Sequence, residues 1–222
     1  MKVTNAKVYD IAESIIASGY PMRTDFNEAN IENEEIYVRN YIKCLLNGKT
    51  IDEADEATKS YLNEDVFKKV KSHINRALNL ANSPAASGHH NYLCGIVVNF
   101  DLTAPRYFWN EFQRYHFAHI VSSSSQVHRL TSFNLEATPD LTEEVWRNAE
   151  SLVKAYEKEG LTWDELVANM PQGIELTARI TTNYLQLKTM YKQRKYHKSI
   201  HWRDFCAWIE TLPLAKELIT CE

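Results

Sequence analysis

The apolar segment that spans residues 93–100 constrains the fold of this chain more than any other feature of its sequence. Its β-branched residues predict a buried central strand, which ends where the stretch from Asp101 to Pro105 begins. It is the longest apolar run in the chain, and it is far shorter than the roughly 20 residues that a membrane helix needs. We therefore expect a soluble protein, without a membrane partner, that contains a small β-sheet.

Most of the remaining sequence predicts helices. Helix starts are indicated by side chains that can cap a helix, in three cases with a carboxylate three residues later, namely Thr50 with Glu53, Asn63, Thr103, Asp140 with Glu143, and Thr162 with Glu165. Apolar spacing predicts further helices at Ile11–Ala17, from Ile174 through Tyr191 and around Trp202–Ile209, and a short strand is expected at Val3–Tyr9. The prediction is a helix-rich α+β fold with a small central β-sheet, in a single domain that covers residues 1–222.

Two further features bear on the packing. The segment Asn82–Gly88 is small, polar and helix-disrupting, and it predicts a loop or a mobile lid. The helices expected near Ala104 and Ile174 predict a shared core, formed by Phe108, Tyr115, Ile180, Tyr184 and Leu187. Glu111 shares the helix face of Phe108 and Tyr115, so a carboxylate is expected on a largely apolar line.

Charge and cysteine content narrow the partners and the compartment. The chain has 25 Lys and Arg against 29 Asp and Glu, a formal net charge of -4. Duplex nucleic acid demands a basic face, so it is not an expected partner, whereas a small anionic ligand is compatible with this charge. The four cysteines show no paired spacing, and no signal peptide is recognisable. We expect a reducing, cytoplasmic setting.

Histidine is abundant, with eight residues, and three groupings invite a metal interpretation: His89 and His90 with Cys94, His116 with His119, and His197 with His201. Spacings of three or four can place two imidazoles on one helix face. Neither HExxH nor Cys-x-x-Cys accompanies them, so we expect no metal held by the protein. The sequence also lacks a phosphate loop, a dinucleotide fingerprint and a GxSxG nucleophile elbow.

Two polar segments carry arginines: the one from Arg106 to Arg129, which contains the serine run Ser122–Ser125, and the one from Arg179 to Arg194. Arginine suits bidentate recognition of phosphate, and a serine-rich turn adds hydroxyl and backbone donors. The alternative is that these arginines only solvate helix faces. Composition alone favours that alternative.

A spacing pattern in two segments resembles the flavin-dependent thymidylate synthase family. The first segment runs from Gly88-His89 through Phe100 and Ala104-Pro105 to Arg114, nine residues after the proline, as in the family's GHxxxxEH, F-T-F, Ala-Pro and R-H-R-x-x-S. In the second segment, the family's L-P, N-x-R-S-L and terminal L-R are matched by Met170-Pro171, Asn183 and Arg194. The resemblance covers about residues 88–130 and 162–210. The segment 24–82 does not match the family.

The resemblance implies a flavin-dependent thymidylate synthase-like fold and a one-carbon transfer to C5 of a pyrimidine deoxynucleotide. It implies FAD as cofactor, a reduced folate as carbon carrier, and a homotetramer whose sites combine several chains. The substrate-binding residues that it implies are Glu111, Arg114, Ser122, Ser124, Arg129 and Arg194. The cofactor-binding residues that it implies are His89, Arg114, Tyr115, His116, Asn183 and His201. It assigns no catalytic side chain and no metal ligand.

The departures from the family lie where its chemistry takes place. Cys94-Gly95 replaces the family's Glu-His pair, and Tyr115 and His116 replace the second and third residues of R-H-R. Arg129 matches the loop arginine only with a three-residue insertion; without one, Gln126 takes its place. Two hypotheses follow: an enzyme of altered specificity, or a nucleotide-binding or interaction protein that keeps the fold without turnover.

Glu111 stands where the family has a glutamine, and two accounts of it remain open. The carboxylate pairs with Arg114 one helical turn away, or it accepts a hydrogen bond from the exocyclic amine of a substrate base. The resemblance further implies that Arg114 and Arg194 approach one another, within a chain or across an interface.

Overall fold

The computed structural model describes residues 1–84 and 87–221, and its chain divides into two compact units. The first unit, called here the serine-loop unit, combines Met1–Ala6 with Asn99–Thr181. The second, the helical unit, combines Lys7–Val98 with the chain from Thr182 onward. Within the described ranges, no helix is both long and apolar enough to cross a membrane.

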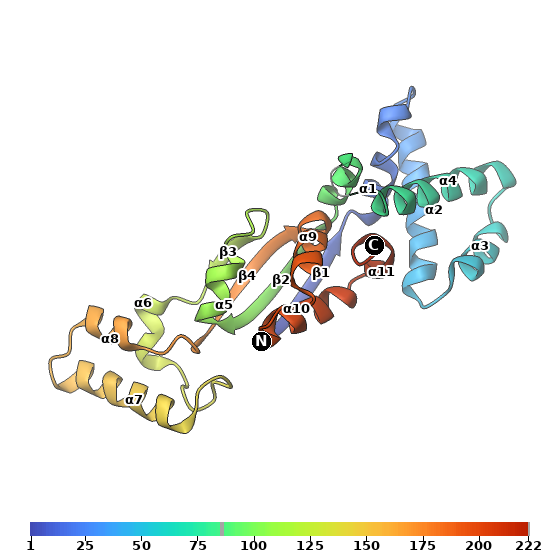
Figure 1. Ribbon diagram of the computed structural model, residues 1–222. Helices are drawn as coiled ribbons and strands as arrows, with labels where there is room; N and C mark the ends of the chain where they lie inside the picture. The colour runs from blue at the N-terminus through green and yellow to red at the C-terminus, as the bar shows by residue number, and fades with distance from the viewer. Residues whose placement is uncertain (85–86, 222) are drawn as a thin grey trace. The chain divides into compact units, whose positions relative to one another are not determined.

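The strands form one four-stranded sheet in the order β1-β2-β4-β3 (Figure 1). Its members are β1 (Lys2–Tyr9), β2 (Val97–Pro105), β3 (His119–Ser123) and β4 (Glu175–Asn183). Side chains of β2 and β4 alternate in burial, as the two-residue period of a strand requires. β3 is an edge strand that pairs antiparallel with β4, and its register shifts between Ile120 and Ser122. This irregularity lies at the start of the serine run Ser122–Ser125, which is called here the serine loop.

The serine-loop unit adds four α-helices to its part of the sheet: α5 (Arg106–Phe112), α6 (Gln126–Arg129), α7 (Glu143–Lys158) and α8 (Trp163–Asn169). A 3-10 turn, η4 (Leu130–Ser132), follows α6. Helices α7 and α8 pack against each other (Figure 1). The core beneath them consists of Leu130, Leu135, Ala149, Leu166, Met170 and Ile174.

The helical unit begins with α1 (Ile11–Ala17), η1 (Tyr20–Met22), α2 (Glu28–Leu46), α3 (Ile51–Lys59), α4 (Glu64–Ala81) and η3 (His89–Gly95). It is completed by α9 (Tyr184–Arg194), α10 (Ile200–Glu210) and α11 (Ala215–Leu218). One core joins α1 to α4, with Ile15, Val38, Tyr41, Val70 and Ile74 buried. The segment 24–82, which does not match the family in sequence, therefore forms α2, α3, α4 and the approach to α2.

Several sequence predictions are confirmed. The fold is α+β and rich in helix, and α1 covers the predicted residues. Thr50 and Thr162 form complete capping boxes with Glu53 and Glu165, and Asn63 caps α4. The five side chains expected in a core are all buried: Phe108, Tyr115, Ile180, Tyr184 and Leu187. The single-domain assignment stays a prediction. Of the predicted loop at 82–88, residues 85 and 86 lie outside the described residues.

Other predictions are wrong in identifiable ways. The long helix expected from Ile174 is strand β4 up to Asn183 and helix α9 only from Tyr184. Thr103 lies inside β2 and caps no helix, because the strand continues to Pro105. Asp140 does not cap α7; its carboxylate accepts a hydrogen bond from the Tyr107 hydroxyl at 2.8 Å. The strand expected from Leu93 begins only at Val97, after η3.

Candidate functional site

The serine-loop unit contains a cavity of about 350 Å³ beside the turn that follows β3. We call it the serine-loop cavity. Its polar wall is formed by Arg106, Asn110, Gln113, Ser123, Ser124, Ser125, Gln126 and Gln172. Its apolar wall is formed by Trp109, Ile120, Leu176 and Ala178. The volume lies in the lower part of the range of small-molecule sites.

Backbone pairing fixes the serine loop against strand β4. The Ser124 amide donates to the Thr177 carbonyl at 2.8 Å, and the Thr177 amide donates to the Ser124 hydroxyl oxygen at 3.1 Å. The next hydroxyl, that of Ser125, accepts from the His128 amide at 3.2 Å and thereby caps α6. Because both hydroxyl oxygens accept backbone N–H groups, their own O–H groups remain donors for a ligand.

Arg106 is the cationic group of the cavity. It begins α5, where its amide donates to the Ile174 carbonyl at 2.9 Å, and its Nη1 donates to the Met170 carbonyl at 3.3 Å. Among the residues that the structure describes, no carboxylate lies within ion-pair distance of this half-buried guanidinium. Burial lowers the pKa of Arg106. A cation without a counter-charge in such a position is stabilised by an anionic ligand.

The rest of the wall can orient a flat polar ligand. The Trp109 indole N–H donates to the Ala104 carbonyl at 3.0 Å, which holds the ring in place. Side-chain amides line the same cavity at Asn110, Gln113, Gln126 and Gln172. An amide offers both donors and an acceptor, so these groups can read the polar edge of a base. The cavity thus combines hydrogen-bond donors that suit a phosphate with side-chain amides that suit the polar edge of a base.

The structure separates the predicted substrate residues. Ser124 lines the serine-loop cavity, whereas Glu111, Arg114, Ser122 and Arg129 belong to the same unit but not to the cavity wall. Arg129 is exposed, and its Nε donates to the Ser132 hydroxyl at 2.9 Å. Gln126 lies in the wall instead, which agrees with the alignment that needs no insertion.

The remaining candidates are divided between the units. Arg194 belongs to the helical unit, with its guanidinium 4.7 Å from the ring centre of Trp202. Its approach to Arg114 stays a prediction, as do both accounts of Glu111. Of the cofactor candidates, Arg114, Tyr115 and His116 follow α5, whereas the helical unit holds the other three, His89, Asn183 and His201.

These cofactor candidates differ in what they can offer a ligand. Arg114, His116 and His89 are exposed, whereas Tyr115 and His201 are buried. The side-chain Oδ1 of Asn183 caps α9 by accepting from the Gln186 backbone amide at 2.9 Å. Neither unit by itself brings all six residues together.

Sequence reasoning missed most of the cavity wall. Arg106 follows the Ala104-Pro105 motif directly, so its position beside the end of β2 was a usable signal. Asn110 and Gln113 lie on and after α5 at helical spacing from Arg106, which is a second signal. Gln172 carries no signal, because only the tertiary fold brings the turn before β4 to this cavity.

The histidine groupings do not form a metal centre within the part of the chain that is described. Across residues 1–84 and 87–221, no three His, Cys, Asp or Glu side chains gather as a metal ion would require. His90, which the sequence grouped with His89, is instead buried, with its Nε2 2.8 Å from the Ser83 carbonyl. Because a carbonyl only accepts, this nitrogen carries the proton. The metal-free expectation stays a prediction.

The fold and the cavity together define a helix-rich α+β protein with a polar, arginine-bearing pocket beside an edge strand. The same fold is found in two solved structures of the flavin-dependent thymidylate synthase ThyX from Helicobacter pylori, both with FAD and dUMP. Their TM-scores are 0.54 and 0.53, at 17% sequence identity, and each match covers 83% of this chain and 94% of the ThyX chain. No protein-family model matches the chain, and no curated protein matches it. This chain therefore has the ThyX fold.

Proposed function

We propose that this protein is a divergent flavin-dependent thymidylate synthase-like enzyme that transfers one carbon unit to C5 of a pyrimidine deoxynucleotide, with altered specificity. The observation that carries the proposal is Arg106, a half-buried guanidinium without a carboxylate partner among the described residues, in the same cavity as the serine loop. The ThyX fold, known with FAD and dUMP in the solved structures, makes a nucleotide the fitting anion.

In this proposal, the phosphate lies at Arg106 and the serine hydroxyls, and the base lies toward the side-chain amides. Arginine presents paired N–H donors that match two phosphate oxygens, and the hydroxyls of Ser123 and Ser124 add neutral donors. Asn110, Gln113 and Gln126 can each donate to a base carbonyl and accept from a base N–H. The residues of the chain bind and orient the nucleotide; no side chain is assigned the role of nucleophile.

The flavin part of the proposal depends on the fold, with partial support from side chains. The exposed His89, Arg114 and His116 can contact a cofactor, whereas the side-chain Oδ1 of Asn183 is engaged as a helix cap. When bound, a reduced flavin supplies a hydride, and a reduced folate supplies the carbon unit.

A non-catalytic nucleotide-binding or interaction protein is the second candidate. It is favoured by Cys94 and Gly95, which stand where the resembled family has Glu-His. Burial raises the pKa of the Cys94 thiol, so this residue does not restore a charged group at neutral pH. A yellow protein with a flavin absorbance band supports the enzyme. A protein that stays colourless after incubation with FAD and desalting supports the second candidate.

The proposal includes assembly as a homotetramer, because the sites of the resembled family combine several chains. Light scattering of the purified chain should give about four times the mass of 25.8 kDa. A monomer at micromolar concentration would contradict this part of the proposal.

The test of the nucleotide site is Arg106→Gln. Loss of a charge-assisted hydrogen bond should weaken dUMP binding by about tenfold to a hundredfold in calorimetry. Arg147→Gln is the matched control, because Arg147 is exposed on α7 and pairs only with neighbours on its own helix. Arg129→Gln should also leave binding unchanged if Gln126 occupies the loop position.

Two results would contradict this assignment of the site. If Arg106→Gln binds dUMP as tightly as the unaltered chain, the serine-loop cavity is not the phosphate site. If neither dUMP nor dCMP binds to any form, the pyrimidine-nucleotide proposal fails as a whole.

A further inference from the structure

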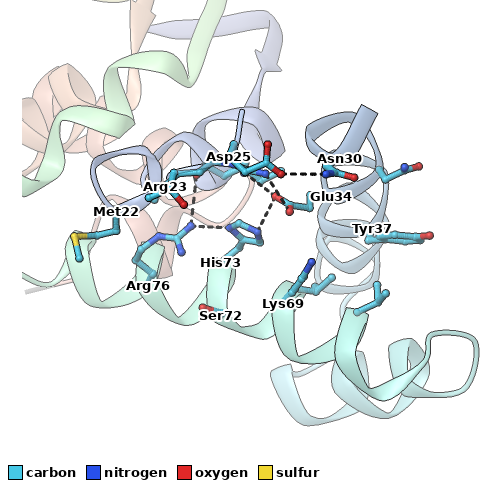
Figure 2. Close-up of a pocket in the computed structure, with 16 residues that line it drawn as sticks. Met22, Arg23, Asp25, Asn30, Glu34, Tyr37, Lys69, Ser72, His73 and Arg76 are labelled. Atoms are coloured by element: carbon cyan, nitrogen blue, oxygen red, sulfur yellow. Dashed lines mark hydrogen bonds and ion pairs between the residues drawn. The ribbon is translucent and has the colours of Figure 1, made fainter. Parts of the chain in front are cut away.

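A second and larger cavity lies entirely within the helical unit. It has a volume of about 680 Å³ and lies among the end of α1, the segment before α2, α2 itself and α4 (Figure 2). We call it the α4 cavity. Most of its wall belongs to the segment 24–82, which does not match the resembled family in sequence. The cavity shares no lining residue with the serine-loop cavity.

A row of hydrogen bonds crosses the α4 cavity. Two nitrogens of Arg23 donate to the two oxygens of Glu34 at 2.8 and 3.2 Å. His73 Nε2 lies 3.2 Å from Glu34 Oε2, and Arg76 Nη2 lies 2.7 Å from His73 Nδ1 (Figure 2). A guanidinium can only donate, so His73 Nδ1 accepts and its proton is on Nε2, toward Glu34. The single negative charge of Glu34 is thus already shared by Arg23 and His73.

Arg76 forms no ion pair with a described carboxylate, although the charge of Glu34 acts on it from across the cavity. Its Nε donates to the Ser18 hydroxyl at 3.1 Å, and its Nη2 reaches the carbonyls of Ile15 and Ile16 at 3.5 Å. All of these partners and His73 are neutral, and within the described ranges no carboxylate lies at ion-pair distance from Arg76. Burial lowers the pKa of Arg76. Its Nη1 makes no hydrogen bond to any described residue.

The backbone at Gly19 makes room for this guanidinium. A Cβ at Gly19 would lie 2.5 Å from Arg76 Cζ, inside van der Waals contact. The backbone of Gly19 has φ -95°, which any residue can adopt, so a side chain added at this position would displace the Arg76 guanidinium without straining the backbone. The end of α1 therefore fixes Arg76 in a position that faces the cavity.

The groups around Arg76 indicate the chemistry of a ligand. Lys69, two helical turns before Arg76 on the same face of α4, makes no ion pair with any described residue (Figure 2). Ser72 adds a hydroxyl, and Val66 and Val70 form an apolar wall. Asp25 also lines the cavity, and its carboxylate accepts from the Asn27 amide and the Asn30 side chain. Two cations that form no ion pair with a described residue thus adjoin an apolar surface.

We propose that the α4 cavity binds a small organic phosphate, with the phosphate at Arg76 and Lys69 and the organic part against Val66 and Val70. The two negative charges of a phosphate dianion match the two cations. Its three free oxygens can accept hydrogen bonds from Arg76, Lys69 and Ser72 at the same time, whereas a carboxylate has only two oxygens. The volume admits a ligand of metabolite size. This inference concerns another unit than the proposed nucleotide site and does not depend on it.

Calorimetry of the full chain with phenyl phosphate tests the inference. We expect one molecule to bind per α4 cavity, with binding at least about tenfold weaker in Arg76→Gln and measurably weaker in Lys69→Gln. Lys68→Gln is the matched control, because Lys68 neighbours Lys69 on α4 but pairs with Glu64 and does not line the cavity. Gly19→Ala keeps every charge and should weaken binding by displacing Arg76.

The other arms of the experiment separate the alternatives. Phenyl phosphate binding that Arg106→Gln abolishes and Arg76→Gln leaves intact would place the ligand in the serine-loop cavity and overturn the inference. Equal binding of benzoate would overturn the phosphate assignment, and absence of binding would overturn the site. If circular dichroism shows that Arg76→Gln is unfolded, the test relies on Lys69→Gln and Gly19→Ala. Unchanged affinity of both variants for phenyl phosphate would refute the inference.

Discussion

At the scale of single residues, the two cavities share one property. Arg106 in the serine-loop unit and Arg76 in the helical unit are both half-buried guanidiniums, and burial lowers the pKa of both. Each is held by neutral partners alone among the described residues. Most arginines of a structural kind pair with carboxylates, as Arg23 does with Glu34. An unpaired, partly desolvated arginine is therefore the most direct sign of an anion site in this chain.

His73 gives the helical unit a dependence on pH. Burial and then the charge of Arg76 lower the pKa of His73, against the attraction of Glu34. The charge of Arg23 also lowers the pKa of His73, and Lys69 and Asp25 line the same cavity. Above a pH of about 6.5, His73 is neutral in both the folded and the unfolded chain. Below that pH the unfolded chain binds a proton more readily than the folded one, so acid lowers the free energy of unfolding.

We expect His73→Gln to remove this contribution, because the glutamine amide can accept from Arg76 and donate to Glu34 without titrating. Urea unfolding between pH 7 and pH 5 should show a smaller loss of stability in His73→Gln than in the unaltered chain. Arg76→Gln should have the same effect in part, because it removes one cause of the lowered pKa. Parallel loss of stability in all three proteins would show that His73 does not titrate differently on folding.

At the scale of elements, sequence reasoning succeeded where the signal is local and failed where two periods coincide. Capping boxes at Thr50 and Thr162 involve neighbouring residues only, and both were predicted. Leu176 and Ile180 are four residues apart, which fits a helix but is also twice the two-residue period of a strand. This segment also contains Ile180 and three threonines, and β-branched residues favour a strand. That preference accounts for strand β4 at these residues.

The candidate site was less predictable than the elements. The Ser122–Ser125 run is a local turn signal, and the family resemblance assigns Ser124 within it to substrate binding. A helix was expected to start near Ala104, with Pro105 in its first turn, and α5 starts at Arg106. The place of Arg106 after Ala104-Pro105 is a local signal, whereas Gln172 and the α4 cavity depend on contacts between segments that are distant in sequence. The spacing of residues in the sequence does not indicate which arginine lacks a carboxylate partner, because that depends on the positions of all carboxylates in the folded chain.

The helix caps provide a test at this scale. The Thr162 hydroxyl accepts from the Glu165 amide at 3.3 Å, and the Glu165 carboxylate accepts from the Thr162 amide at 2.8 Å. We expect Thr162→Ala to lower the free energy of unfolding by about 1 kcal/mol. Thr142→Ala is the matched control, because Thr142 precedes α7 without a side-chain cap and its loss should be smaller. Equal losses in urea unfolding would contradict the role of the box.

At the scale of the whole molecule, the division into two units does not coincide with the ends of the strands. β1, β2 and β4 each begin in one unit and end in the other. Strands that run through a division cannot lose their structure in one unit without losing neighbours in the same ladder. Two compact units can therefore still belong to a single domain, as the sequence predicts. The cooperativity of unfolding distinguishes one domain from two separate domains.

We expect the two units to unfold in one transition. Amide hydrogen exchange, followed by mass spectrometry in increasing urea, should show the most protected segments of both units exchanging through a common opening. Leu166 is fully buried in the serine-loop unit, and Leu166→Ala should cost about 2–5 kcal/mol of stability. If the sheet couples the units, that loss also lowers the protection of α2 and α4 in the helical unit, whereas Lys68→Gln on the surface of α4 leaves it unchanged. A loss of protection confined to the serine-loop unit would mean that the units are separate domains, and the single-domain prediction would then be wrong.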